Sequence, residues 1–291
     1  MALLREAVMG GDVRQYKELR EKILRPTRKP VRPGDKPDDS KPVIHLVVGD
    51  SHSRWDVPNE RYSLLGRFIA WLKPDVVVDI GDWWDMPALS SYDRGTVSFE
   101  GKRYWRDIVS GVDAQARMQD ELDRHAPKSY RPFKLRTLGN HEERIMRVAQ
   151  ADPRFEGLIG YDDLQSSFYG WDQRELGEPT VVNGVAYCHW MVSGNMGRPI
   201  GGENPAATLL KKHFHSCVVG HSHLFDYAER YAMGRRMCAA QAGCFFEHDD
   251  AYAGPQVNVM RRRGLLVLRD VMAGEFEPEW WGMDRLRRQV G

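Results

Sequence analysis

The sequence predicts an α/β fold, and three observations support this prediction. Short runs rich in β-branched residues at 42–50 and 75–82 are typical of strands buried on both faces of a sheet. A helical pattern of apolar residues at 61–74 lies between these two runs. The later strand candidates follow one another without long helices, so we expect a second sheet that is largely antiparallel.

The N-terminal region precedes this pattern. Residues 1–24 carry apolar positions at helical spacing, interrupted at Gly10-Gly11, which predicts a short amphipathic helix. Five prolines between Arg25 and Pro42 exclude a regular element and predict an extended, locally basic arm. A solvated tail and a contact with nucleic acid are both compatible with this arm. We therefore separate 1–42, a helix and a basic proline-rich arm, from a domain at 43–291.

The remaining elements of the domain follow from the same patterns. Further strands are expected at 133–140, 184–190, 216–221, 235–243 and 264–271, and helices at 111–125, 142–150 and 205–213. Without an internal repeat, this order predicts one α/β domain with two sheets. The connection at about 83–111 is too long for a plain turn, and it reads as an insert rich in aromatic and basic residues.

Composition excludes several classes of protein. With 42% hydrophobic residues, 29% charged residues and a net charge of +1, the chain is neither globally disordered nor strongly basic. No apolar run approaches the roughly 20 residues that span a bilayer, and Arg5 and Glu6 interrupt any signal-peptide core, so we expect a cytoplasmic protein without a membrane segment. The four cysteines form no CxxC pair and are expected to be small core residues.

Residues that commonly bind metals stand at the end of each predicted strand up to Val219. Carboxyl ends of strands in an open α/β sheet meet in one crevice, so these side chains should lie close together. A glycine shortly before several of them allows the backbone to turn sharply and approach closely. In chain order they are Asp50, His52, Asp82, Asp85, Asn140, His141, His189, His221 and His223. The other histidines, such as His45 and His248, have no partner motif and are expected in the core or on the surface.

The mixture of imidazole, carboxylate and carboxamide groups favours a transition metal over the all-oxygen shells of Ca²⁺. Mn²⁺ suits such a set first, with Fe, Zn²⁺, Ni²⁺ or Mg²⁺ as alternatives.

The blocks DxH, GDxxD, GNH(D/E), H and GHxH occur here in that order, and they resemble the calcineurin-like metallophosphoesterase superfamily. The resemblance covers about residues 43–224. It implies a four-layer α/β/β/α sandwich with mixed sheets and a centre of two divalent ions per chain. Two ions about 3.5 to 4 Å apart can clamp a phosphate and lower the pKa of a bridging water from about 15.7 towards 7. Hydroxide would then attack phosphorus in line with the leaving oxygen. By position it also implies the ligands: Asp50, His52 and His223 for the first metal, Asp82 as the bridge, and Asn140, His189 and His221 for the second.

Two further residues of these blocks suit catalysis. His141 follows the expected ligand Asn140 without being a ligand itself, which suits a general acid or a group that stabilises the transition state. Asp85 resembles the aspartate that orients the equivalent histidine in Ser/Thr protein phosphatases. Its carboxylate should raise the pKa of His141 and keep the imidazole protonated. The alternative is that Asp85 only caps a turn.

Substrate contacts are expected around the metals. Trp83 and Trp84 begin the aromatic and basic insert, which suits the stacking of bases and the binding of phosphates, or equally a loop packed on itself. Arg198 lies in the glycine-rich loop at 193–202, directly after His189, and suits a phosphate oxygen. The alternative for this loop is a flexible surface segment.

The type of ester is the open question. The GNHEER and GDWWDM stretches look more like bacteriophage phosphoesterases labelled DNA-repair exonuclease-like than like protein phosphatases. Ser/Thr protein phosphatases place Arg-Gly after GDxxD, where this chain has Met86-Pro87, so a phosphate-binding arginine is missing. We therefore expect a phosphodiesterase or nuclease acting on DNA, other nucleic acid or nucleotides. A phosphomonoesterase for a small phosphate or a protein is the alternative, and a metal-stabilised binding scaffold is a third reading.

Overall fold

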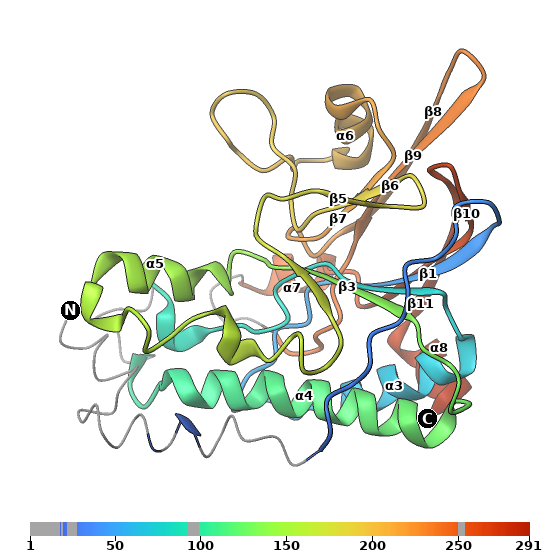
Figure 1. Ribbon diagram of the computed structural model, residues 1–291. Helices are drawn as coiled ribbons and strands as arrows, with labels where there is room; N and C mark the ends of the chain where they lie inside the picture. The colour runs from blue at the N-terminus through green and yellow to red at the C-terminus, as the bar shows by residue number, and fades with distance from the viewer. Residues whose placement is uncertain (1–17, 19, 22–27, 92–98, 250–253) are drawn as a thin grey trace.

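The computed structural model describes residues 18, 20–21, 28–91, 99–249 and 254–291 (Figure 1). In that part of the chain, six α-helices accompany two mixed β-sheets, so the α/β class is confirmed. Most of the strands and helices expected from the sequence are present. Three kinds of difference occur. Strands at the edges of the sheets were not predicted, one helix begins earlier than expected, and one strand pairs with other strands than expected.

The first sheet has the strand order β11-β10-β1-β2-β3-β4. Neighbouring strands from β1 to β4 are parallel, whereas β10 is antiparallel to both β1 and β11. The carboxyl ends of β1, β2 and β3 therefore meet at one edge. The strands are β1 (Val43–Val48), β2 (Val76–Asp79), β3 (Phe133–Thr137), β4 (Asp172–Arg174), β10 (Gly264–Met272) and β11 (Glu275–Gly282).

The second sheet has the order β5-β6-β7-β9-β8 and is not largely antiparallel, so that prediction was wrong. β6, β7 and β9 are parallel, and only the edge strands β5 and β8 pair in the opposite direction. A helix connects β6 to β7, and the unpredicted β8 turns the chain back before β9, so three strands share one direction. The strands are β5 (Thr180–Val182), β6 (Val185–Tyr187), β7 (Cys217–Val219), β8 (Phe225–Ala232) and β9 (Arg235–Ala242). The strand expected at 264–271 is β10 and belongs to the first sheet.

The α-helices include all those predicted within the domain, and two more near its C-terminal end. They are α3 (Glu60–Leu72), α4 (Tyr104–His125), α5 (Glu143–Ala151), α6 (Pro205–His213), α7 (Gly254–Met260) and α8 (Met283–Val290). Helix α3 ends where Lys73 adopts a left-handed conformation just before Pro74. Helix α4 begins at Tyr104 rather than at 111, so part of the expected insert is helical. Among the described helices, none has the length and apolarity required to cross a bilayer.

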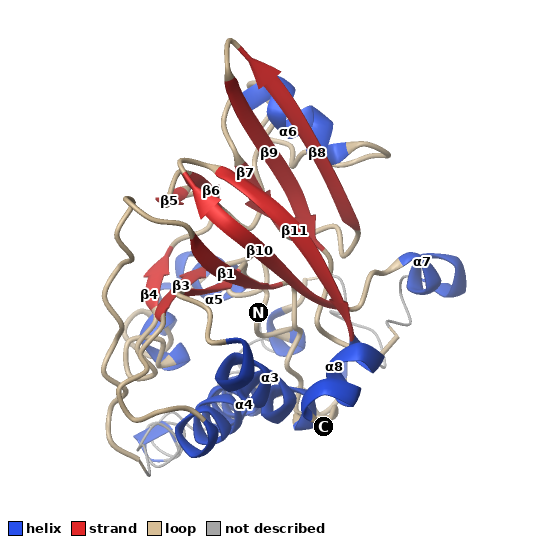
Figure 2. Ribbon diagram, turned by 90° about the vertical axis from the view of Figure 1, so that its right-hand side faces the viewer, coloured by secondary structure: helices blue, strands red, loops and turns tan. Residues whose placement is uncertain are grey.

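Three large clusters of buried apolar side chains hold these elements together. Figure 2 shows how the helices lie around the two sheets. One lies between the two sheets and includes Val47 and Val78 of the first and Val218 of the second. Another packs α3, α4 and α8 against the other face of the first sheet. A third packs α6 against the other face of the second sheet. All four cysteines are buried and free, as predicted.

The N-terminal arm has no regular structure from 28 to 42, as its prolines predict. The helix expected at 1–24 falls almost entirely outside the described residues. Arg28 pairs with Asp120 of α4 at 3.0 Å, and Lys36 donates a hydrogen bond to the carbonyl of Val181 in β5 at 3.0 Å. The arm therefore lies against both α4 and the second sheet before it enters β1 (Figure 1).

Candidate metal centre

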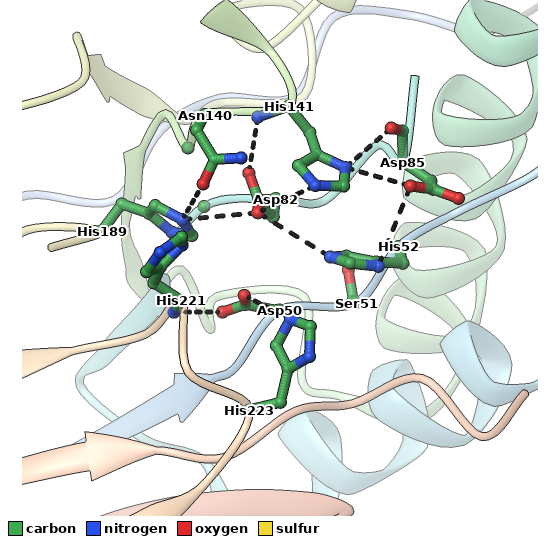
Figure 3. A network of polar contacts seen from close by, with 12 residues as sticks. Asp50, Ser51, His52, Asp82, Asp85, Asn140, His141, His189, His221 and His223 are labelled. Atoms are coloured by element: carbon green, nitrogen blue, oxygen red, sulfur yellow. Dashed lines mark hydrogen bonds and ion pairs between the residues drawn. The ribbon is translucent and has the colours of Figure 1, made fainter. Parts of the chain in front are cut away.

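The ends of strands from both sheets bring all the expected metal ligands to one place (Figure 3). β1, β2 and β3 of the first sheet lead to Asp50, Asp82 and Asn140. β6 and β7 of the second sheet lead to His189 and to the His221–His223 turn. The side chains of these residues point toward one another, so the centre lies where the two sheets meet (Figure 3).

Asp50, His52 and His223 form one potential metal-binding group, with their ligand atoms within 4.8 Å of one another. Nε2 of His223 lies 3.0 Å from Oδ2 of Asp50. His52 is completely buried, and among the described residues neither of its ring nitrogens has a hydrogen-bond partner. An unsatisfied buried polar group costs about 1 to 3 kcal/mol, and a bound cation would remove that cost. The surroundings of His52 therefore fit a metal ligand.

Asp82, His189 and His221 form a second group of the same kind. Nε2 of His189 lies 3.3 Å from Oδ2 of Asp82 and 3.1 Å from Oδ1 of Asn140, which joins Asn140 to this group. The same Oδ2 of Asp82 lies 3.8 Å from Nε2 of His52 in the first group. The Asp82 carboxylate thus stands between the two groups, where a bridging ligand would have to lie.

Backbone strain is concentrated at these residues. His52, Asp82, His221 and His223 have φ angles of 43°, 53°, 71° and 61°, in the left-handed region that side chains other than glycine seldom adopt. Such conformations cost about 1 to 3 kcal/mol each and persist where the surroundings impose them, frequently at functional sites. Their position at four expected ligands indicates that the fold holds these side chains in a specific arrangement.

The close backbone approach expected from the glycines is confirmed at two positions. A Cβ on Gly139 would lie 2.0 Å from Oδ1 of Asp82, and one on Gly220 would lie 2.5 Å from Oδ1 of Asp50. Both distances are far below van der Waals contact. The backbone of each glycine therefore forms part of the wall around a carboxylate of the centre.

Glu142 is a positioning residue that the sequence prediction missed. Its buried carboxylate accepts hydrogen bonds from the backbone N–H groups of Asp82 at 3.1 Å, Gly139 at 2.8 Å and Trp84 at 2.9 Å. Burial and the neighbouring carboxylates of Asp82 and Asp79 raise the pKa of Glu142 to about 7. This one side chain ties the loop after β2 to the loop after β3. The only signal in the sequence is its place in the GNHE block.

His141 and Asp85 lie side by side, as the sequence predicts. Nδ1 of His141 lies 3.0 Å from the Asp85 carboxylate and 2.7 Å from its backbone carbonyl oxygen. The expected rise in the pKa of His141 was wrong, because burial lowers this pKa although Asp82 and Asp85 oppose the change. The pKa of Asp85 is lowered instead, because contacts with His141 and the charge of His52 outweigh its burial. Asp85 is thus the ionised partner that holds the imidazole.

The two histidines of the second group differ in their proton affinity. Burial and the charge of His189 lower the pKa of His221 to about 4, so its ring is neutral and able to bind a cation. Burial alone would lower the pKa of His189, but Asp82 and Asp50 outweigh it and raise this pKa to about 10. A cation on His189 would therefore have to displace a proton from the ring, and such binding would strengthen as the pH rises.

The prediction that Trp83 and Trp84 bind substrate was wrong. Both side chains are 0% exposed, and they donate hydrogen bonds to the carbonyls of Gly111 and Ile108 in α4, at 3.1 and 3.3 Å. They pack α4 beneath the centre and offer no surface to a base. The first part of the expected insert is therefore a segment packed on the domain, while residues 92–98 lie outside the described residues.

Arg198 and His248 lie outside the two potential metal-binding groups. Arg198 is exposed, and none of the hydrogen bonds or ion pairs found among the described residues joins its side chain to the candidate metal centre, so its contact with a phosphate stays a prediction. His248, expected in the core or on the surface, offers a ring nitrogen within 4.8 Å of ligand atoms of His52 and Asp85. No motif surrounds His248 in the sequence, so only the fold reveals its place at the rim of the centre.

A hollow of about 370 Å³ adjoins the second group. Asn140 and His221 form part of its wall, so it opens directly beside two expected ligands.

The sequence as a whole matches no protein-family model and no curated protein. What the chain does is therefore inferred from its own residues.

Proposed function

We propose that the protein is a metal-dependent phosphohydrolase that cleaves phosphodiesters of nucleic acid or nucleotides. The observation that carries this proposal is the pair of Asp and His groups with the Asp82 carboxylate between them and with His141 and Asp85 beside them. The likeness of the five sequence blocks to the calcineurin-like metallophosphoesterases supports the same reading. A phosphomonoesterase remains the alternative function.

The donor set fits two divalent ions per chain. Asp50, His52 and His223 would hold one, Asn140, His189 and His221 the other, and Asp82 both. Mixed nitrogen and oxygen donors suit Mn²⁺ first, with Fe, Zn²⁺, Ni²⁺ or Mg²⁺ as alternatives. When bound, such ions would neutralise charge on the phosphoryl oxygens and lower the pKa of a water molecule.

The residues around this donor set would orient the substrate and handle its proton. Asp85 holds Nδ1 of His141, so Nε2 is the ring atom left for an oxygen of the phosphate or of the leaving group. Glu142 keeps the loops that carry Asp82 and Asn140 at a fixed spacing. The protein thus supplies orientation and one imidazole, and no residue needs to form a covalent intermediate.

A diester is favoured over a monoester by the hollow beside Asn140 and His221. A diester carries a second substituent on phosphorus, and the hollow provides room for it next to the centre. The arrangement of α3, α4 and α8 on one sheet and α6 on the other supports a four-layer α/β/β/α sandwich of the metallophosphoesterase type as the fold (Figure 2).

Replacement of Asp82 tests the function. With Mn²⁺, the wild-type protein should cleave bis-p-nitrophenyl phosphate or labelled single-stranded DNA, and Asp82→Ala should lose at least about 10²-fold because both metal groups lose a shared ligand. Initial rates at equal protein concentration give the comparison. Asp284→Ala, which removes an exposed carboxylate on α8, serves as the matched control and should keep full activity.

The outcomes separate the candidate functions. Hydrolysis of p-nitrophenyl phosphate alone, with no cleavage of either diester, would replace the phosphodiesterase by the phosphomonoesterase. No turnover of any of these substrates with Mn²⁺, Fe²⁺, Zn²⁺, Ni²⁺ or Mg²⁺, in protein shown to be loaded by metal analysis, would contradict a phosphohydrolase.

A further inference from the structure

The hollow beside the second metal-binding group has walls of two kinds. Its volume of about 370 Å³ falls within the range of about 300 to 1,000 Å³ found for small-molecule sites. Leu89, Val148 and Pro199 give it an apolar side, and residues of α5 give it a cationic side. A substrate whose phosphorus lies at the centre would place one substituent here.

An aromatic ring stands where the hollow meets the centre. Trp190 follows His189 directly, and its ring lies 4.7 Å from the His221 ring in an edge-on arrangement. Trp190 lines the hollow and, unlike Trp83 and Trp84, is only partly buried. Flat aromatic groups stack well on such a ring, and the ring accepts any base because every base has a π face.

Two arginines of α5 form the cationic side. Arg144 donates from Nη1 to the backbone carbonyl of Asp85 at 2.8 Å, which fixes the position of its planar group. Arg147 donates from Nη2 to the carbonyl of Asn140 at 2.9 Å and pairs with Glu143 at 3.2 Å. These three charged groups of α5 leave a net positive charge at the hollow before any metal binds. Each guanidinium has five N–H donors, so both retain donors for a phosphate.

We propose that this hollow is a nucleoside-phosphate subsite. Trp190 stacks on the base next to the scissile phosphate, and Arg144 and Arg147 bind the following phosphate. Resting on the proposed function, this subsite narrows the substrates to phosphodiesters that carry a nucleobase, either at the end of a nucleic-acid strand or in a free dinucleotide. A small diester such as methyl p-nitrophenyl phosphate would use the metal centre without using the subsite.

The first test compares two diesters with the same leaving group, thymidine 5′-(p-nitrophenyl phosphate) and methyl p-nitrophenyl phosphate. The wild-type protein should show the higher kcat/KM for the thymidine ester. Trp190→Ala should lower the ratio of the two kcat/KM values about tenfold, the effect expected from the loss of one stacked base. Trp190→Phe should restore most of the ratio, since phenyl rings also stack.

Trp55 provides the matched control. Its side chain is 45% exposed and lies under the guanidinium of Arg106 at 5.0 Å, and it is not among the residues that line the hollow. Trp55→Ala should leave the ratio of kcat/KM values unchanged. The proposed subsite would be overturned if Trp55→Ala lowered the ratio of kcat/KM values while Trp190→Ala left it unchanged.

The second test concerns the following phosphate. In the thymidine ester the scissile phosphate is on the 5′ oxygen, so the following phosphate would be on the 3′ oxygen of the same nucleoside. The dinucleotide TpTp should therefore have a lower KM than TpT, and Arg147→Gln should remove most of this difference. Metal analysis of this variant separates lost phosphate binding from a disturbed Asn140. The same KM measurement with single-stranded oligonucleotides of increasing length distinguishes two kinds of substrate. If KM falls further with length, the subsite binds nucleic acid. If KM stays constant, the subsite binds free dinucleotides. Equal KM values for TpTp and TpT in the wild type would overturn the phosphate contact.

Isothermal titration calorimetry measures the affinity of the subsite directly, so this test depends neither on turnover nor on how well one variant folds. Thymidine 5′-monophosphate should bind the wild-type protein more tightly than inorganic phosphate, and Trp190→Ala should remove that difference. Failure of the wild type to hydrolyse either diester would contradict the proposed function. Hydrolysis of both with equal kcat/KM values, together with equal affinities for the two phosphates, would overturn the subsite alone.

Discussion

His141 is held from one side only. Its Nδ1 faces the carboxylate and the backbone carbonyl of Asp85, whereas Nε2 lies 3.8 Å from Asp82, beyond hydrogen-bonding distance. Because Nδ1 carries the proton that Asp85 accepts, Nε2 of the neutral ring retains its lone pair. Under the proposed function, this atom would exchange a proton with the substrate without any movement of the ring.

Replacement of His141 tests this role. We expect His141→Ala to reduce kcat about 10² to 10⁴-fold while the metal content stays constant, because the imidazole handles a proton and is not among the expected ligands. Single-turnover rates and metal analysis provide the two measurements. His125→Ala, which removes an exposed histidine of α4, should behave as the wild type. Full activity in His141→Ala would exclude it from catalysis, and loss of metal would instead make it a ligand.

Among the elements, α4 depends on one small residue for its packing. A Cβ on Gly111 would lie 1.7 Å from Nε1 of the buried Trp84. The same indole donates a hydrogen bond to Ile108, and the neighbouring Trp83 donates to the carbonyl of Gly111. The two tryptophans therefore fit against the helix only where a side chain is absent.

Gly111→Ala should destabilise the protein by about 1 to 3 kcal/mol, the usual cost of overpacking a core, although alanine favours a helix by about 1 kcal/mol. Urea denaturation followed by circular dichroism measures the free energy of unfolding. Gly160→Ala is the control, because its added Cβ would meet no atom within 4 Å. An unchanged midpoint in Gly111→Ala would show that α4 can shift away from Trp84 without cost.

Elements with a clear apolar pattern were predictable, and those at the edges were not. β1, β2 and α6 lie where their runs of buried residues place them. The edge strand β8 is intermediate or exposed throughout, so its sequence shows no buried face. β11 contains Pro278, which argues against a strand, and an edge position tolerates it. The parallel order of the second sheet depends on β8 and could not be predicted without it.

The site residues that could be predicted are those that are of a metal-binding type and also stand directly after a predicted strand. The expected ligands follow strands, and the fold brings them together because those strands end at one place. Glu142 was missed because its role is to accept backbone hydrogen bonds, which leave no pattern in the sequence. Trp83 and Trp84 were misassigned because an aromatic residue can either stack on a ligand or fill a core, and only burial distinguishes the two.

For the whole molecule, the centre is a junction between the two sheets. Asp50 comes from the first sheet, and His223, its partner at 3.0 Å, comes from the second. An ion held by both would add bonds across the interface that the inter-sheet apolar cluster already forms. Metal binding should therefore stabilise the protein as a whole and not only the loops that carry the ligands.

Removal of metal should lower the melting temperature. At a free metal concentration about 100 times the Kd, binding to the folded state alone contributes about 2.7 kcal/mol, which EDTA would abolish. Differential scanning calorimetry with and without Mn²⁺ measures the shift. Asp82→Ala should show a much smaller shift, because the ligand shared by both groups is gone. Identical melting temperatures with and without metal in the wild type would contradict a two-metal centre.

The pairing of β1 with β10 also sets an order of events during synthesis. β1 begins at Val43 and β10 at Gly264, and the backbone N–H of Phe245, just after β9, donates to the carbonyl of Asp50 at 2.7 Å. Ribosomes add about 5 to 20 residues per second, so β1 emerges many seconds before its partner exists. Until β10 has left the exit tunnel, the nascent chain lacks the strand that pairs with β1 beside Asp50, so metal binding at Asp50 would be a late step of maturation.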